Sequence, residues 1–232
     1  MQYTNTVRGI FRDRPNRFIA HVETGGILET VHVKNTGRCR ELLVPGAEVI
    51  LETSDNPARK TKYDLICVNK SGRWINMDSQ VPNQVAADWI LNGRLFPEKI
   101  SLKREKTYGN SRFDIYVESE YRKAFIEVKG VTLEEDGIVR FPDAPTARGV
   151  KHLEELIRAH ESGYEVYLFL VIQMKAVKYF EPNWKTHPEF GNTLKRAADA
   201  GVKILAYDCV VTEDSIEICD PVPVHLEQPD TV

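Results

Sequence analysis

Residues 111–129, SRFDIYVESEYRKAFIEVK, constrain the fold more than any other stretch of the chain. Two runs rich in β-branched and aromatic residues, 112–117 and 123–128, flank a polar segment at 118–122. Both runs alternate in polarity, which is typical of strands, and a short polar connection between them is typical of a hairpin. The sequence therefore predicts an antiparallel β-hairpin at the centre of the chain.

The register of this hairpin brings two carboxylates together. Suppose that Glu118 stands opposite Lys123. Antiparallel pairing then puts Asp114 opposite Glu127, with their Cβ atoms roughly 4.5–5.5 Å apart. Because side chains alternate between the two faces of a strand, Glu127 and Lys129 share one face. The sequence thus predicts two acids and one lysine on a single face of the sheet.

These three side chains predict a metal site. Two carboxylates this close repel each other unless a proton or a cation lies between them, and an unpaired charge in an apolar strand is costly. Mg²⁺ (or Mn²⁺) suits Asp114 and Glu127 as ligands, with the backbone carbonyl of Val128 as a third. Lys129 could then position or deprotonate a water, which is a layout for metal-assisted hydrolysis of a phosphodiester. The alternative is that Lys129 only neutralises the two acids as an ion pair at the rim of the sheet.

Composition limits the class of protein. At 232 residues the chain fits one large domain or two modest ones, and 42% hydrophobic with 28% charged residues is ordinary for a globular protein. No apolar run approaches the roughly 20 residues of a membrane span, and the N-terminus lacks the apolar stretch of a signal peptide, so we expect a cytoplasmic protein. The four cysteines form no CxxC pair, which argues against a zinc site. A net charge of −3 argues against a generally basic nucleic-acid binder, although the first 80 residues carry a small excess of basic side chains.

Residues 1–80 are predicted to form a small all-β domain. Five short strands are expected at 7–12, 18–22, 27–33, 48–53 and 63–68, separated by turn signals rich in Gly, Pro and Asn. A helical turn is expected at 38–43, between the third and fourth strands. A five-stranded barrel of this kind is OB-like, a fold often used for oligonucleotides. Residues 71–82 are expected to be a joint to the next domain.

This domain carries a set of arginines that could contact phosphates. They are Arg12, Arg14, Arg17, Arg38 and Arg40. Solvated arginine-rich loops are an equally good interpretation. Phe11 and Phe18 could stack on bases, but aromatic residues that alternate along strands are more typical of a core.

Residues 83–232 are predicted to form a mixed sheet flanked by helices. The expected order is a helix at 84–91 capped by Asn83, a strand at 100–106, the central hairpin, a helix from Thr146 or Asp143 to about residue 160, and a strand at 164–172. A polar loop at 174–187, a helix at 188–200 and strands at 202–207 and 211–219 follow. A strand–helix–strand crossover implies parallel strands. Joined to an antiparallel hairpin, it gives a mixed α/β sheet.

Further basic residues lie near the hairpin and on the helix that follows it. Arg148 and His152 are four residues apart on one helix face and could meet DNA phosphates near the helix N-terminus. Lys151 and Arg112 complete the candidate nucleic-acid contacts. The alternative is a solvated helix face with an exposed histidine.

Several strings of this chain resemble the SfsA family, the sugar fermentation stimulation proteins. They are SRFD at 111–114, EVKGVTL at 127–133, FPDAPTARGVKHLEEL at 141–156, the pattern PEF…L…A…GV at 188–202, NTG at 35–37 and VPG at 44–46. The resemblance covers nearly the whole chain. It implies an OB-like N-terminal domain and a C-terminal domain of the PD-(D/E)xK nuclease fold, with Asp114, Glu127 and Lys129 as the motif residues. Phe113 stands where the motif has proline, and Asp88 is the only acid in the helix from which many such nucleases take a further ligand.

The resemblance also implies DNA binding and a link to the regulation of sugar metabolism, especially of maltose. Our first hypothesis is therefore a Mg²⁺-dependent, nuclease-like protein that binds DNA. The second is a DNA-binding transcriptional regulator whose nuclease core no longer cuts. An enzyme of small phosphorylated sugars finds no supporting motif, since the chain lacks a Gly-rich phosphate loop. The sequence leaves open whether the chain forms a homodimer.

Overall fold

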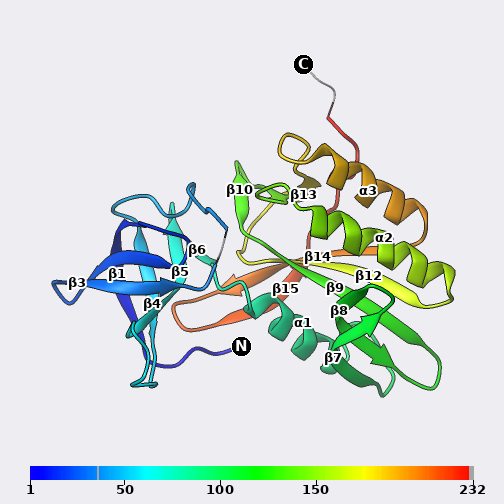
Figure 1. Ribbon diagram of the computed structural model, residues 1–232, viewed down its shortest axis with the longest axis horizontal. Helices are drawn as coiled ribbons and strands as arrows, with labels where there is room; N and C mark the ends of the chain where they lie inside the picture. Colours follow the sequence, from blue (N-terminus) through cyan, green and yellow to red (C-terminus); the bar gives the residue numbers. More distant parts are fainter. Residues whose placement is uncertain (36, 230–232) are drawn as a thin grey trace.

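The computed structural model describes residues 1–35 and 37–229, and they form two domains (Figure 1). The first is built on one sheet and the second on another, with the joint between them at the start of helix α1. The division that we propose, residues 1–80 and 83–232, falls in the first turn of this helix. Thr36, the middle residue of the NTG string, lies outside the described residues. No helix within them is long and apolar enough to cross a membrane.

The N-terminal domain is the expected OB-like barrel of five strands. They are β1 (Thr6–Asp13), β2 (Ile19–Thr24), β3 (Ile27–Val33), β4 (Glu48–Thr53) and β5 (Tyr63–Lys70). Their order is β3-β2-β1-β4-β5, and a short parallel pairing of β3 with β5 closes the barrel. Alternate residues of these strands fill the interior, among them Ala20, Val22 and Leu51. The expected helical turn is a single turn in which the N–H of Leu43 donates to the carbonyl of Cys39.

The C-terminal domain is a mixed six-stranded sheet with helices on both faces. Its order is β15 (Ile216–Pro221), β14 (Lys203–Val211), β12 (Glu165–Ile172), β9 (Lys123–Val131), β8 (Ser111–Glu118) and β7 (Ser101–Tyr108). Strands β9, β12 and β14 are parallel, and the others are antiparallel to their neighbours. Helices α2 (Ala147–Glu161) and α3 (Pro188–Asp199) cover one face, and α1 (Val81–Leu91) covers the other (Figure 1). The expected architecture is confirmed.

Four short strands correct the predicted loops. Strand β6 (Arg73–Asn76) extends the barrel sheet into the expected joint. Strands β10 (Leu133–Glu135), β11 (Ile138–Phe141) and β13 (Tyr179–Pro182) form a third, small sheet. The first two lie where no helix or strand is predicted, and the third lies in the predicted polar loop. Each has only three or four residues, too few to show an alternation of polarity.

The start of α1 also differs from the prediction. The helix begins at Val81 rather than at 84, and Pro82 occupies its first turn, where the missing N–H of proline costs nothing. Asn83 is therefore inside the helix and is not its cap, which leaves its side chain free to contact the sheet. The predicted end is confirmed, because Asn92 caps the helix and Gly93 follows with a positive φ.

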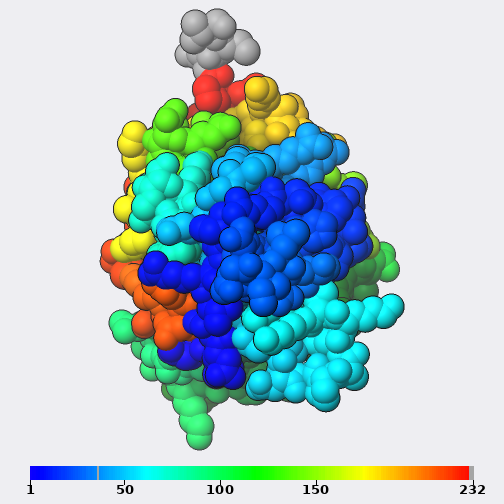
Figure 2. All heavy atoms as spheres, turned by 90° about the vertical axis from the view of Figure 1, so that its left-hand side faces the viewer, coloured from blue at the N-terminus to red at the C-terminus, as the bar shows by residue number. Residues whose placement is uncertain are grey.

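Polar contacts join the two domains closely. The side chain of Gln173, at the end of β12, donates to Asn76 at 2.9 Å, and both residues are buried. Gln2 pairs with Ser215, so that the N-terminal residues lie against β14 and β15, as Figure 2 shows by the contact of blue and orange surfaces. Between the domains runs a cleft of about 200 Å³, lined by Asn35 and Gly37 of the barrel and by residues that follow Lys129 on β9.

Candidate active site

The hairpin has the predicted register. Glu118 pairs with Lys123, and the ladder continues to Ile115 opposite Ile126. Beyond that pair, a side chain of β8 rather than its backbone accepts a hydrogen bond from β9. The carboxylate of Asp114 accepts the N–H of Val128 at 2.8 Å. Asp114 is thus tied to the strand segment that carries Glu127, as the sequence analysis predicts.

Helix α1 holds the other oxygen of Asp114. The side-chain amide of Asn83 donates to it at 2.9 Å. Asp88, the acid considered on the same helix, instead accepts a hydrogen bond from Gln84. The contact of Asn83 was not foreseen, because it depends on how α1 packs against the sheet.

Glu127 is buried, with 1% of its surface exposed, and only one of its two carboxylate oxygens is satisfied. Its Oε1 accepts from Lys129 Nζ at 2.5 Å and from the Nδ1 of His152. Its Oε2 has no hydrogen-bond partner among the described residues. Glu127 and Lys129 therefore share a face as predicted, and one buried oxygen is left without a donor.

The position of His152 corrects the prediction. The sequence predicts a phosphate contact or an exposed histidine at this position, whereas the side chain is buried against Glu127. It reaches Glu127 because Thr146 caps α2, its hydroxyl accepting the N–H of Gly149 at 3.0 Å, and so sets the start of the helix over the sheet. Arg148 lies within 3.4 Å of the other ring nitrogen. His152 is thus a link between Arg148 and the buried carboxylate.

The two carboxylates have different electrostatic environments. Burial raises the pKa of Asp114, and the negative charge of Glu127 raises it further; nearby Lys129 offsets this only in part. Burial alone would also raise the pKa of Glu127. There, however, the hydrogen bond from His152 and the positive charge of Lys129 outweigh burial, and the pKa falls below its ordinary value. Glu127 is held ionised, whereas Asp114 lacks a counter-charge of its own.

The donor set fits a hard divalent cation. Glu127 Oε2 is an unused buried oxygen, and each oxygen of Asp114 accepts one hydrogen bond and keeps a second lone pair. The N–H and C=O of one strand residue point to the same side, so the carbonyl of Val128 is directed toward β8 as its N–H is. Carboxylate and carbonyl oxygens are the ligands that Mg²⁺ and Ca²⁺ prefer.

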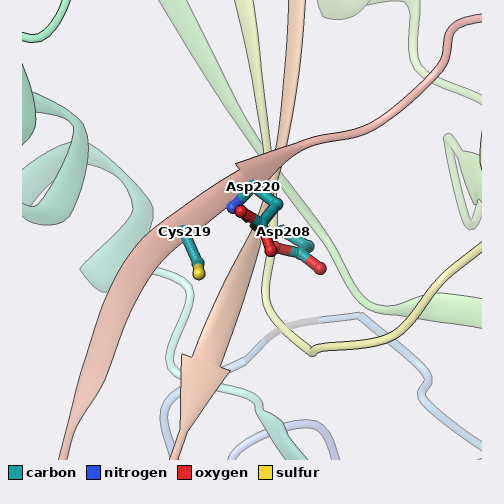
Figure 3. A group of neighbouring side chains, drawn as sticks. All are labelled: Asp208, Cys219 and Asp220. Carbon is teal, nitrogen blue, oxygen red and sulfur yellow. Dashed lines mark hydrogen bonds between the residues drawn. The ribbon is translucent and has the colours of Figure 1, made fainter.

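A second group of possible ligands is already neutralised. Asp208, Cys219 and Asp220 lie close together on β14 and β15 (Figure 3). Lys175 donates to Asp208 at 2.8 Å and also to Asp220. Its ammonium supplies the positive charge that a metal would otherwise bring, so we place no cation here.

Two of the five barrel arginines, Arg12 and Arg14, have partners within the barrel. Arg12 is ion-paired with Glu23. Arg14 is turned inward, where its guanidinium donates to four backbone carbonyls, including that of Arg17 at 2.7 Å and that of Arg38 at 2.8 Å. It therefore holds two loops together rather than facing solvent.

Arg17, Arg38 and Arg40 are exposed, and no carboxylate of the described residues forms an ion pair with them. The two candidate aromatic residues also separate. Phe11 is a core residue at 2% exposure, whereas Phe18 is 54% exposed.

The basic residues near the hairpin lie on the surface around the site. Arg148 is exposed beside His152. Arg112 is exposed and 3.6 Å from Glu105, and Lys151 donates to the carbonyl of Asn110 at 2.8 Å. Arg112 and Lys151 would have to give up these contacts to bind a polyanion. The role of these basic residues in binding stays a prediction.

Comparison with known proteins identifies both domains. Residues 13–77 match the family model described as the SfsA N-terminal OB domain, and residues 80–215 match that of the sugar fermentation stimulation protein RE domain. A sugar fermentation stimulation protein homolog of Clostridium beijerinckii is 59% identical over 97% of this chain and 100% of its own length. A homolog of Desulfitobacterium hafniense is 60% identical over 97% of this chain and 99% of its own.

One solved structure agrees in fold over the whole chain. The structure of Pyrococcus furiosus SfsA in complex with Ca²⁺ superposes with a TM-score of 0.86, at 28% identity, and covers 97% of this chain and 98% of that one. The agreement includes both domains and their arrangement. The chain belongs to the SfsA family of sugar fermentation stimulation proteins.

Proposed function

We propose that this protein binds DNA and hydrolyses phosphodiester bonds with the help of Mg²⁺ or Mn²⁺. The observation that carries the proposal is the buried Oε2 of Glu127, which has no donor among the residues that the structure describes, next to Asp114 and Lys129. A buried carboxylate oxygen without a partner is costly, and a cation would satisfy it. The relative from P. furiosus was solved with Ca²⁺, which shares the preference of Mg²⁺ for oxygen ligands.

Each residue of the site has a distinct task in this proposal. When bound, the cation polarises a phosphoryl oxygen and lowers the pKa of a water. Glu127 and Asp114 would hold it, with the Val128 carbonyl. Lys129 directs its ammonium at the attacking water and at the charge that develops on the phosphate. His152 positions Glu127, because its Nδ1 contacts Oε1 and so leaves Oε2 free.

The experiment is cleavage of labelled single-stranded, duplex and branched DNA and RNA with Mg²⁺, with Mn²⁺ and with EDTA. We expect metal-dependent cutting that Lys129→Ala abolishes. The matched control is Lys123→Ala, on the same strand, because Lys123 is exposed and pairs with Glu118 at the far end of the hairpin. Cutting that survives in Lys129→Ala would exclude Lys129 from the mechanism.

A DNA-binding regulator that does not cut is the second candidate. It is favoured by the contact of Lys129 Nζ with Glu127 at 2.5 Å, which is the geometry of an ion pair that only neutralises a buried acid. The sugar fermentation stimulation name of its relatives also agrees with a regulatory role. Tight DNA binding without cleavage, unchanged by EDTA and by Lys129→Ala, would establish this candidate instead.

A further inference from the structure

Loops of the barrel that contain residues 17–18 and 38–40 present an exposed aromatic ring together with several exposed arginines. The ring of Phe18 is 54% exposed, although Phe11 of the neighbouring strand is buried. The adjacent Arg17 and the arginines at 38 and 40 are exposed, and none has an ion-pair partner in the described part of the chain. Exposed aromatic rings interleaved with arginines are typical of surfaces that bind single-stranded nucleic acid.

Hydrogen bonds fix the backbone that carries Phe18, which favours binding. Asn16 accepts the backbone N–H groups of Phe18 at 2.9 Å and Ile19 at 3.1 Å, and Phe18 in turn accepts the N–H of Val33 at 2.8 Å. A ring on a fixed backbone loses little conformational entropy when a base stacks on it. More than half of the surface of Phe18 faces solvent, so truncation of this side chain should cost the fold little.

Arg14 joins this surface to the catalytic side of the molecule. Its guanidinium binds the carbonyls of Arg17 and Arg38 and also those of Asn35 and Gly37. Asn35 and Gly37 line the cleft between the domains.

The opposite wall of the cleft belongs to the C-terminal domain. It is lined by Gly130, the residue after Lys129, and by Thr132. The exposed ring, the arginines and the cleft therefore follow one another across the domain joint toward β9, the strand that carries Lys129.

The size of the cleft and the exposed ring favour an unpaired strand over a duplex. At about 200 Å³ the cleft cannot enclose a double helix, which could only lie across its mouth. Bases in a duplex are also stacked on each other and offer no free face to Phe18. An unpaired strand, in contrast, can offer a free base to the ring.

We propose that the substrate of the site is a single strand, or the single-stranded part of a larger nucleic acid, with a base stacked on Phe18 and phosphates at Arg17 and Arg38. This inference rests on the proposed function and specifies its substrate class. It assigns the barrel the task of selecting unpaired strands and of leading them through the cleft toward Lys129.

The test measures binding without cleavage. Wild-type protein in EDTA is titrated with a labelled single-stranded oligonucleotide and with a duplex of the same length, and fluorescence anisotropy is recorded. We expect tighter binding of the single strand. Phe18→Ala should weaken it roughly 5- to 140-fold, from about 1–3 kcal/mol per stacked base, while Phe18→Trp restores it. Tyr121→Ala is the matched control, because Tyr121 is 75% exposed in the hairpin turn between β8 and β9, outside this surface.

The arginines have a separate readout. Replacing Arg17 and Arg38 by Gln should reduce the slope of log K against log salt by about 1.4, since each phosphate contact to a single strand contributes about 0.7. A Phe18→Ala protein that unfolds at the wild-type temperature but binds single strands as well as the wild type would overturn the inference. So would tighter binding of the duplex, or a Phe18 surface that responds only to a protein partner.

The two proposals fail in different ways. Metal-dependent cutting of duplex DNA that Phe18→Ala leaves unchanged would refute the single-strand inference and keep the proposed function. Single-strand binding that depends on Phe18, without cutting of any substrate, would keep the inference about the surface and refute the hydrolytic function.

Discussion

Asp114→Asn should raise the thermal stability of the cation-free protein and remove the extra stability that a divalent cation confers. The pKa of Asp114 is raised by burial and by the charge of Glu127, so its ionised form opposes folding at neutral pH. Its neutral form stabilises the folded protein below the ordinary aspartate pKa of about 3.9, and this stabilisation is lost as the pH rises through the raised value. An uncharged side chain of the same shape therefore should stabilise the cation-free protein at neutral pH.

The hydrogen bonds of the site can survive this substitution. Asp114 accepts from the Val128 N–H at 2.8 Å and from the Asn83 amide at 2.9 Å. An asparagine keeps the first bond through its carbonyl oxygen. It keeps the second if Asn83 turns its amide over and accepts rather than donates. No buried donor is then left without a partner, so the loss of about 1–3 kcal/mol for an unmade bond is avoided.

The response to a cation should be lost. A ligand at a hundred times its Kd stabilises the folded state by about 2.7 kcal/mol. For a chain of 232 residues each kcal/mol raises the unfolding temperature by about 2–4 °C, so the wild type should gain roughly 5–11 °C. Asp114→Asn should show almost none of this gain, and no metal-dependent cleavage.

Differential scanning calorimetry in EDTA and in MgCl₂ measures both effects. The matched control is Asp88→Asn, whose carboxylate contacts Gln84 on its own helix and should leave the cation response unchanged. Two results would refute the reasoning. One is a variant that unfolds several degrees below the wild type in EDTA at neutral pH, and the other is a variant that keeps the full gain from Mg²⁺.

Three further substitutions test other parts of the structure. Burial raises the pKa of Asp64, but hydrogen bonds from Arg59 and His32 outweigh it and hold the pKa below its ordinary value. The stabilisation is therefore present above about pH 4 and is lost progressively as the pH falls through the lowered pKa. Asp64→Asn should cost about 1–3 kcal/mol at pH 7 and less at pH 3, as urea unfolding at the two pH values would show. Gly130→Ala should cost about 1–3 kcal/mol and lower cleavage, because its Cβ would lie 2.4 Å from Oε1 of Gln173; wild-type thermal unfolding and cleavage would contradict this. Asp220→Asn should leave the Mg²⁺-induced rise in unfolding temperature unchanged, and a smaller rise would mean that a cation does bind there.

Local sequence determines the hairpin and much of the barrel, and these were predicted well. The turn at 118–122 fixes which residues of β8 and β9 pair, and a period of two then decides the face of Glu127 and Lys129. The barrel strands were found because turn signals separate them. Strands β11 and β13 were missed because Ile138 pairs with Tyr179, a contact that no short window of sequence reveals.

The site contacts of His152 and Asn83 cannot be predicted from the sequence, because they depend on how a helix is rotated over the sheet. His152 lies four residues before the buried Leu156, at the edge of the apolar stripe of α2, where a small rotation decides between solvent and core. The sequence predicts Asn83 as a cap because its pattern places the start of α1 three residues later. Phe18 was grouped with Phe11 by pattern, and only the closed barrel shows which of the two rings faces inward.

The two acids of the site have unequal tasks because their neighbours differ. His152 and Lys129 already stabilise the charge of Glu127 before any cation arrives, so this carboxylate can serve as a permanent anchor. Asp114 has hydrogen bonds but no counter-charge of its own, and its ionisation is favourable only when positive charge lies beside it. At a pH near or below the raised pKa of Asp114, this carboxyl group is protonated before a cation binds, so binding of the cation should release a proton. Asp114→Asn should abolish that release. The pH dependence of cation affinity would then report on Asp114 rather than on Glu127, although both supply ligands to the same ion.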